Sequence, residues 1–72
     1  MMEYYSLKDQ KKEPLVGRMY RILVDGDEAI PVVVSDIFEA YKGMIVEYYA
    51  LDDPEHMITD SVSVFCEWYG EW

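Results

Sequence analysis

The sequence predicts a mainly β domain, a small antiparallel meander of four to five strands that is curled into a partly open barrel. Runs rich in β-branched and aromatic residues recur from Leu15 to the end of the chain, as is typical of strands. Short polar turns containing Asp, Gly and Pro separate these runs. About half of the residues are hydrophobic. A flat sheet with one covered face would leave many of them exposed, so the sheet is expected to curl and bury the remainder.

The first two strands are predicted over residues 15–24 and 29–38. Between them, the run Asp25, Gly26, Asp27 and Glu28 indicates a tight hairpin, because Asp-Gly tolerates the positive φ that such turns need. Pro31 has no amide donor, which places it at a sheet edge, at the start of a strand or in a bulge.

The third and fourth strands are predicted over residues 44–51 and 57–69, with turns at 39–43 and 52–56. The last run is ambiguous, because its apolar residues fit both a helical and a strand period. The helical stripe consists of Val62, Phe65, Cys66 and Tyr69, with Thr59 or Asp60 as its cap. The strand face consists of Val62, Val64, Cys66 and Trp68. The β-branched and aromatic content favours the strand, and a helical turn remains the alternative.

Residues 1–14 are predicted as an N-terminal tail or edge element, and residues 15–72 as the small barrel domain. The segment 8–14 has no apolar periodicity, and Pro14 disfavours helix at the preceding residue. Tyr4, Tyr5 and Leu7 are candidates for docking as an edge strand. The expected core consists of Tyr20, Ile22, Val32, Val34, Val46, Tyr48, Val62 and Val64.

Charge is distributed unevenly along the chain. Residues 22–72 contain twelve acidic residues and one basic residue, Lys42, a net charge of −11, whereas residues 1–21 carry +2, which gives −9 for the chain. Such a field repels nucleic acid and anionic membranes and attracts basic surfaces, so we expect no direct nucleic-acid binding and no membrane association. The alternative is that the acidity only keeps the domain soluble.

Catalytic and metal-binding constellations are not expected. Two carboxylate clusters, Asp25, Asp27 and Glu28 and then Asp52, Asp53 and Glu55, carry the oxygen ligands that Ca²⁺ prefers, but their spacing does not match an EF-hand loop and indicates solvated turns. The single cysteine, Cys66, indicates a buried small hydrophobe, and the single histidine, His56, a solvated turn residue. Neither has the partners that nucleophilic catalysis needs, so we expect no enzyme, no metal and no cofactor. The lone cysteine and the lack of an apolar export segment predict a cytoplasmic location.

Four segments of the chain suggest a fold family. They are Gly17-Arg18-Met19-Tyr20-Arg21, Val32-Val33-Val34-Ser35-Asp36, Ile45-Val46-Glu47-Tyr48-Tyr49 and Val62-Ser63-Val64-Phe65. Their pattern resembles the small SH3-like or Tudor-like β-barrels of bacterial and phage proteins of unknown function, over most of residues 15–69. The resemblance implies a partly open SH3-like barrel and no particular function, because that fold carries many functions.

Aromatic side chains beside carboxylates are the predicted binding feature. Successive strand residues point to opposite faces, so the faces that carry Glu47 and Glu67 are expected to be the outer ones. Rings there can accept Arg or Lys through cation–π contacts, while carboxylates hydrogen-bond the cation. The predicted partner-binding residues are Glu47, Tyr49, Phe65, Glu67 and Tyr69.

Three functional hypotheses follow from these features. The first is a non-enzymatic binding module that engages a basic protein surface through an acidic, aromatic outer face. The second is an acidic nucleic-acid mimic or inhibitor of phage type, since carboxylates two residues apart on a strand lie about 6.6–7 Å apart, close to the spacing of phosphates along one DNA strand. The acidic residues nevertheless cluster in predicted turns. The third is a structural subunit, either of a homo-oligomer or of a larger assembly.

Overall fold

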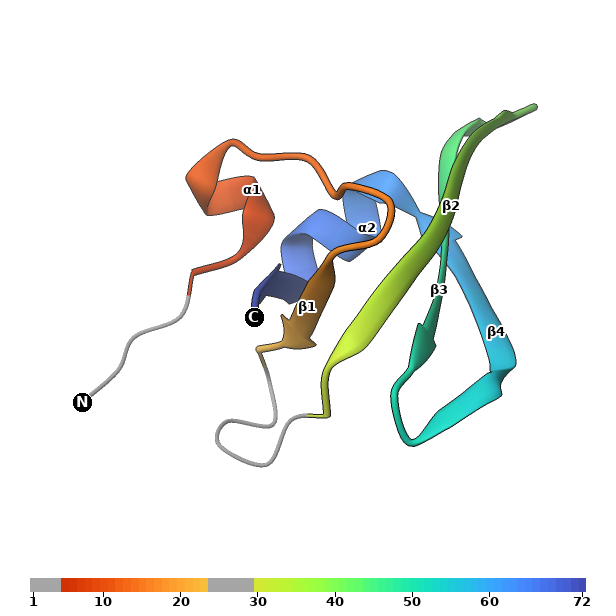
Figure 1. Cartoon of the computed structure of the whole chain (residues 1–72). Coiled ribbons are helices and arrows are strands. Elements are labelled where there is room, and N and C mark those ends of the chain that lie inside the picture. Colours follow the sequence, from red (N-terminus) through yellow and green to blue (C-terminus); the bar gives the residue numbers. More distant parts are fainter. Residues whose placement is uncertain (1–4, 24–29) are drawn as a thin grey trace.

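The computed structural model describes residues 5–23 and 30–72 and confirms a mainly β fold (Figure 1). Within these residues, five strands form one antiparallel sheet in the order β4-β3-β2-β1-β5. In chain order the elements are α1 (Leu7–Gln10), β1 (Met19–Ile22), β2 (Val32–Ala40), β3 (Gly43–Ala50), β4 (Asp53–Ser61), α2 (Val62–Trp68) and β5 (Tyr69–Glu71).

The sheet is a meander that does not close into a complete barrel. Strands β1 to β4 pair with their neighbours in sequence, and β5 returns to pair with the other edge of β1. Strands β4 and β5 are therefore the two edges, and α2 connects them. The partly open sheet agrees with the prediction. The predicted turn at Asp25 to Glu28 lies outside the described residues.

Strand β4 begins earlier than predicted. The sequence indicated a polar turn over 52–56, but the turn occupies only Leu51 and Asp52, and Ala50 already pairs with Asp53. Pro54 lies inside β4, where its missing N–H is tolerated because β4 is an edge strand.

The strand predicted over 57–69 is wrong over residues 62–68, where the chain forms helix α2, and Tyr69 begins the separate strand β5. Ser61 is the N-cap, and its side-chain oxygen accepts a hydrogen bond from the backbone N–H of Val64 at 3.2 Å. The predicted caps Thr59 and Asp60 lie two residues and one residue too early, respectively. The helical stripe was the correct alternative, and packing of that stripe overrides the strand propensity of Val and Phe.

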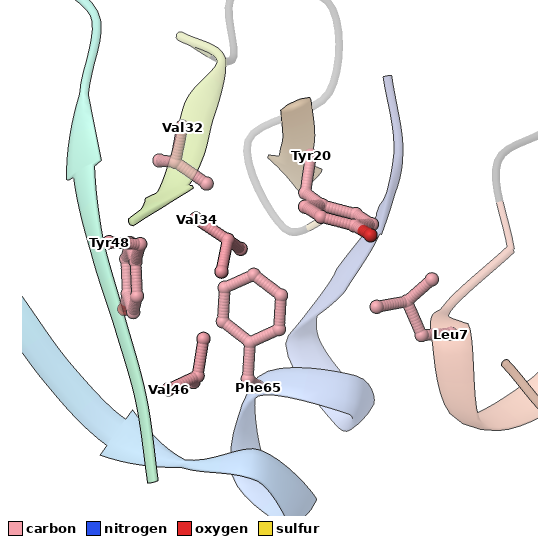
Figure 2. Packing of buried hydrophobic residues seen from close by; sticks show 7 residues of the cluster. All are labelled: Leu7, Tyr20, Val32, Val34, Val46, Tyr48 and Phe65. Carbon is pink, nitrogen blue, oxygen red and sulfur yellow. The ribbon is translucent and has the colours of Figure 1, made fainter. Parts of the chain in front are cut away.

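An aromatic cluster around Phe65 forms the centre of the core (Figure 2). Phe65 is fully buried, and its ring packs edge-on against Tyr20 and Tyr48, with ring centroids 5.6 and 5.0 Å away. The ring of Tyr69 stacks on Phe65 at 4.3 Å with an interplanar angle of 6°. Helix α2 thus brings one ring into contact with side chains from β1, β3 and β5.

The predicted core is largely confirmed on the sheet and partly wrong on α2. Five of its residues are buried, and these are Tyr20, Val32, Val34, Val46 and Tyr48. Ile22 and Val62 are half-buried. Val64 is 44% exposed, because residues two apart lie on different sides of a helix.

The N-terminal segment packs onto the domain and supplies a core residue. Leu7 in α1 is 1% exposed, and Ser6 forms an isolated antiparallel bridge with Gly70 of β5. This close approach requires glycine at position 70, because a Cβ there would overlap the carbonyl oxygen of Tyr5. The segment 5–14 therefore contains both a strand-like bridge and a short helix that the sequence did not indicate.

Two valines provide a test of this core. Val46→Ala should lower the free energy of unfolding by about 1–3 kcal/mol, because a fully buried side chain is truncated and a cavity remains. Val64→Ala should change it by less than about 0.5 kcal/mol, since Val64 is exposed and alanine favours helix. Urea denaturation measures both values. Equal destabilisation by the two substitutions would contradict the helix at 62–68.

Candidate functional site: an open acidic face of the sheet

One face of the β2–β4 sheet has no helix on it within the described residues (Figure 1). Helix α2 packs against β3 and β4 on the other face, and α1 packs against α2. Phe65 of α2 lies beside Val34 and Val46, which point to that covered face (Figure 2). The two helices therefore cover the same side of the sheet.

Strand register determines which side chains share the uncovered side. Met19 pairs with Val33 and Val33 with Tyr49; Phe38 pairs with Ile45. A third row runs from Asp36 through Glu47 to Thr59. Each of these residues alternates with a residue of the covered face, such as Val46 or Tyr48. We call this surface the open face, and define it as Met19, Val33, Ser35, Asp36, Phe38, Ile45, Glu47, Tyr49, Met57 and Thr59.

A β-bulge in β2 fixes the acidic centre of the open face. The register shifts between Val34 and Asp36, so the extra residue Ser35 projects toward Glu47. The Ser35 hydroxyl lies 2.9 Å from Oε1 of Glu47 and 3.8 Å from the sulfur of Met57. These contacts hold the Glu47 carboxylate beside apolar side chains of β3 and β4.

Apolar surface surrounds these carboxylates. Met19, Phe38 and Met57 are 41%, 39% and 49% exposed. Tyr49, on the same face, is half-buried. Exposed apolar patches on soluble proteins commonly mark interaction sites. The open face thus combines an apolar strip with acidic residues at its centre.

Negative charge is concentrated on the strands that form this face. Residues 32–61, which span β2 to β4, contain seven acidic residues and one basic residue, Lys42. On the helical side, by contrast, Lys8 pairs with Glu67 at 3.3 Å and Lys12 with Glu71 at 2.6 Å. The acidic surplus therefore lies on the β2–β4 sheet.

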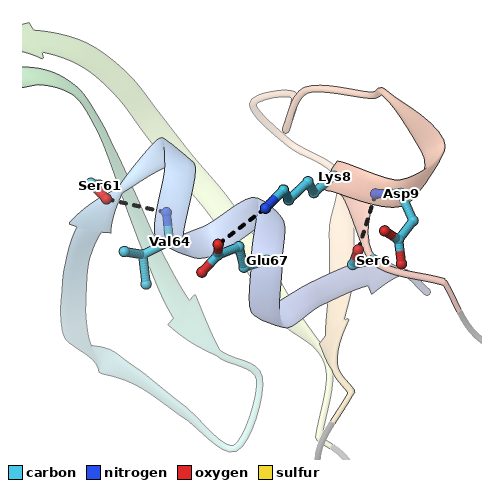
Figure 3. A network of polar contacts seen from close by, with 6 residues as sticks. All are labelled: Ser6, Lys8, Asp9, Ser61, Val64 and Glu67. Carbon is cyan, nitrogen blue, oxygen red and sulfur yellow. Dashed lines mark hydrogen bonds and ion pairs between the residues drawn. The ribbon is translucent and has the colours of Figure 1, made fainter.

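The five predicted binding residues do not share one surface. Glu47 and Tyr49 lie on the open face as predicted. Phe65 was predicted to be exposed and is instead fully buried. Tyr69 packs on Phe65, and Glu67 lies on α2 in its ion pair with Lys8 (Figure 3). The error has one physical cause, because helix α2 replaces the strand whose alternation had placed all three residues outside.

Sequence reasoning missed the contribution of β2 and β4 to the open face. Asp36 and Phe38 follow the bulge at Ser35, which changes the alternation between Val34 and Asp36 and has no sequence signature of its own. Met57 and Thr59 lie in β4, within the strand that had been predicted to begin at residue 57, but they were not assigned to a face. Residues 36 and 38 are two positions apart in a strand, and this spacing could have placed both of them on one face of the sheet.

Cys66 and His56 are two reactive groups outside the open face. The Cys66 thiol has a raised pKa, first because it is partly buried and then because Glu13 is negatively charged, which disfavours the nucleophilic thiolate. His56 is exposed in β4. Within residues 5–23 and 30–72, no group of three His, Cys, Asp or Glu side chains is placed to hold a metal ion. Of the two helices described there, neither has the length and apolar character needed to cross a bilayer.

A pocket lies on the helical side, between α1, the following segment, β1 and β5. Leu7, Leu15 and Tyr20 provide its apolar lining, and its charged residues are Lys11, Lys12, Glu13, Arg18 and Glu71. Lys12 and Glu71 already neutralise each other there. The pocket therefore has mixed charge, whereas the open face has charge of one sign.

Comparison with known proteins identifies no relative: no family model, no curated protein and no solved structure matches the chain. The resemblance to SH3-like barrels therefore remains a prediction. The function is inferred below from the open face and its charge.

Substitution of Tyr69 and of Tyr49 tests which of the two residues belongs to the core and which to the surface. Tyr69→Ala should lower the free energy of unfolding by about 2–3 kcal/mol, because it removes the ring stacked on Phe65. Tyr49→Ala should lower it by less than about 1 kcal/mol, since Tyr49 lies on the open face. Thermal and urea unfolding measure both changes. A larger loss for Tyr49→Ala would place Tyr49 in the core and contradict the assigned face.

Tyr48 should make the stability depend on alkaline pH. Burial raises the pKa of its hydroxyl, and the hydrogen bond that it donates to Asp60 raises the pKa further. Above the ordinary value of 10.0 the unfolded chain loses this proton and the folded protein keeps it, so stability falls as pH rises.

Between pH 10 and 11, the wild-type protein should lose about 1 kcal/mol more stability than Tyr48→Phe, as measured by urea denaturation at each pH. Tyr41→Phe is the matched control for removal of a tyrosine hydroxyl, because Tyr41 is fully exposed in the β2–β3 turn. Identical slopes for wild type and Tyr48→Phe would show that the Tyr48 hydroxyl ionises equally in both states.

Proposed function

We propose that the protein is a non-enzymatic binding module whose open face engages a basic protein surface. The observation that carries the proposal is the apolar strip of Met19, Phe38 and Met57 around the carboxylates of Asp36 and Glu47, on a sheet face without a helix among the described residues. A partner with Lys or Arg beside apolar side chains complements this surface.

The chemistry of the open face supports a cationic partner over an anionic one. Tyr49 and Phe38 offer ring faces to a cation, and neighbouring carboxylates can accept its hydrogen bonds. The seven acidic residues of 32–61 speed encounter with a positive surface and repel nucleic acid. The raised pKa of Cys66 supports a role without nucleophilic catalysis.

A lysine–leucine amphipathic peptide of 16 residues provides a probe for this proposal, with a glutamate–leucine peptide of the same pattern as the charge-reversed control. The basic peptide should bind, and the shifts of backbone NMR signals should cluster on residues of the open face. Its affinity should fall with added salt, because the attraction is electrostatic. The acidic peptide should not bind.

Tyr49→Ala should weaken binding of the basic peptide by at least about 1 kcal/mol, the range of an interface anchor. Tyr41→Ala is the control, since this fully exposed tyrosine lies in the β2–β3 turn, outside the open face. Isothermal titration calorimetry measures both affinities. Equal binding of the acidic peptide, or equal loss in both variants, would overturn the proposed function. Sedimentation of the free protein as a dimer that buries the open face would indicate the homo-oligomer instead.

A further inference from the structure

Strand β4 is the unpaired edge of the sheet. In the strand order it has one neighbour, β3, and no other strand of residues 5–23 and 30–72 pairs with it. The opposite edge, β5, is bridged by Ser6 through Gly70. An exposed edge presents free backbone N–H and C=O groups, to which another extended chain can bind.

The hydrogen-bond pattern shows which backbone groups of β4 point outward. The N–H of Val34 donates to the carbonyl of Arg18 next to β1, and the N–H of Leu51 donates to the carbonyl of Pro31. Because adjacent residues of a strand bond in opposite directions, Leu51 and Tyr49 bond toward β2, and Tyr48 bonds toward β4.

Tyr48 is paired with Ile58, so the N–H and C=O of Ile58 point toward β3. The pairing is regular from Ile58 to Ser61, so by the same alternation the N–H and C=O of Thr59 point away from the sheet. The register shifts between Tyr48 and Ala50, which ends the regular pairing on the Met57 side of Ile58. Thr59 also carries its side chain on the open face, since it pairs with Glu47. The sulfur of Met57 lies on the same face, 3.8 Å from the Ser35 hydroxyl. Backbone donors and the acidic face therefore meet along one edge.

The two halves of β4 differ in how well they are protected against strand addition. The first half contains Asp53, Pro54 and Glu55, and proline and charge are the usual devices that block pairing at a sheet edge. The second half, Met57 to Asp60, contains no proline. The second half of β4, next to the open face, can therefore pair with another strand, whereas Pro54 and the charged residues of the first half disfavour such pairing.

We propose that an extended, basic segment of the partner pairs as a sixth strand with β4 at Met57–Thr59. This inference rests on the proposed function and specifies how the partner binds. Added next to Thr59, such a strand would continue the row of Asp36, Glu47 and Thr59, and a Lys or Arg in that row would point toward the Glu47 carboxylate. A second copy of this chain fits less well, because each copy carries a net charge of −9.

Thr59→Pro tests the backbone contact directly. It removes the outward N–H of residue 59 and keeps the hydrogen bonds that Ile58 and Asp60 make to β3. Edge strands tolerate proline at a position such as 59, where the N–H faces away from the sheet. Thr59→Val is the matched control, because it keeps the N–H and the β-branched shape. The probe is an alternating lysine–valine octapeptide, with alternating glutamate–valine as the charge control.

The lysine–valine peptide should bind the wild type and Thr59→Val with similar affinity, and Thr59→Pro about tenfold more weakly. Hydrogen exchange on the wild type is an independent readout that does not depend on the folding of a variant. In the free protein the amide of Thr59 should exchange faster than that of Ile58, and the peptide should slow exchange at Thr59.

Three results would overturn the inference: failure of the lysine–valine peptide to bind, equal affinity for Thr59→Pro and Thr59→Val, or unchanged exchange at Thr59 on binding. Binding of the lysine–leucine peptide that depends on Tyr49 but not on Thr59 would remove strand addition and leave the proposed function intact. Binding that depends on Thr59 but not on Tyr49 would keep strand addition and remove the open face as the recognition surface.

Discussion

Burial of the Phe65 ring is the constraint on which the packing of this small domain depends. The ring contacts Tyr20 of β1, Tyr48 of β3 and Tyr69 of β5, and so joins strands that lie far apart in the sequence. A domain of this size buries only about 60% of its unfolded surface, so one aromatic cluster makes a large share of its core. The helix at Val62–Trp68 is the conformation that brings Phe65 and Tyr69 to the same side.

The position of α2 bears on both the open face and the edges of the sheet. Since the helix covers one face and α1 packs on it, the opposite face of β2–β4 keeps its apolar and acidic side chains exposed within the described part of the chain. The helix also connects β4 to β5, which are the opposite edges of the sheet, and within residues 5–23 and 30–72 no strand other than β3 pairs with β4.

Charge is also distributed differently between the helical side and the β2–β4 sheet. Lys8 and Lys12, from the basic N-terminal part, pair with Glu67 and Glu71 at the helical side. These pairs are exposed and each contributes little stability, about 0–1 kcal/mol, but they neutralise acidic groups of α2 and β5. The acidic residues of β2–β4 have a single basic residue, Lys42, among them in the sequence. The proposed recognition of a basic segment uses this remaining charge.

The strand-rich composition, the meander and the buried faces of β2 and β3 could be predicted from the sequence, because the β-branched run Val32 to Val34 and the alternation in Val46 to Tyr48 report local geometry. The sequence also placed Glu47 and Tyr49 opposite that core. Tertiary structure decided the rest. Residues 62–69 fit both periods, and only the space between β1, β3 and β5 selects the helix that buries Phe65. The bulge at Ser35 and the free edge of β4 likewise depend on which strands pair, a long-range outcome that no local pattern encodes.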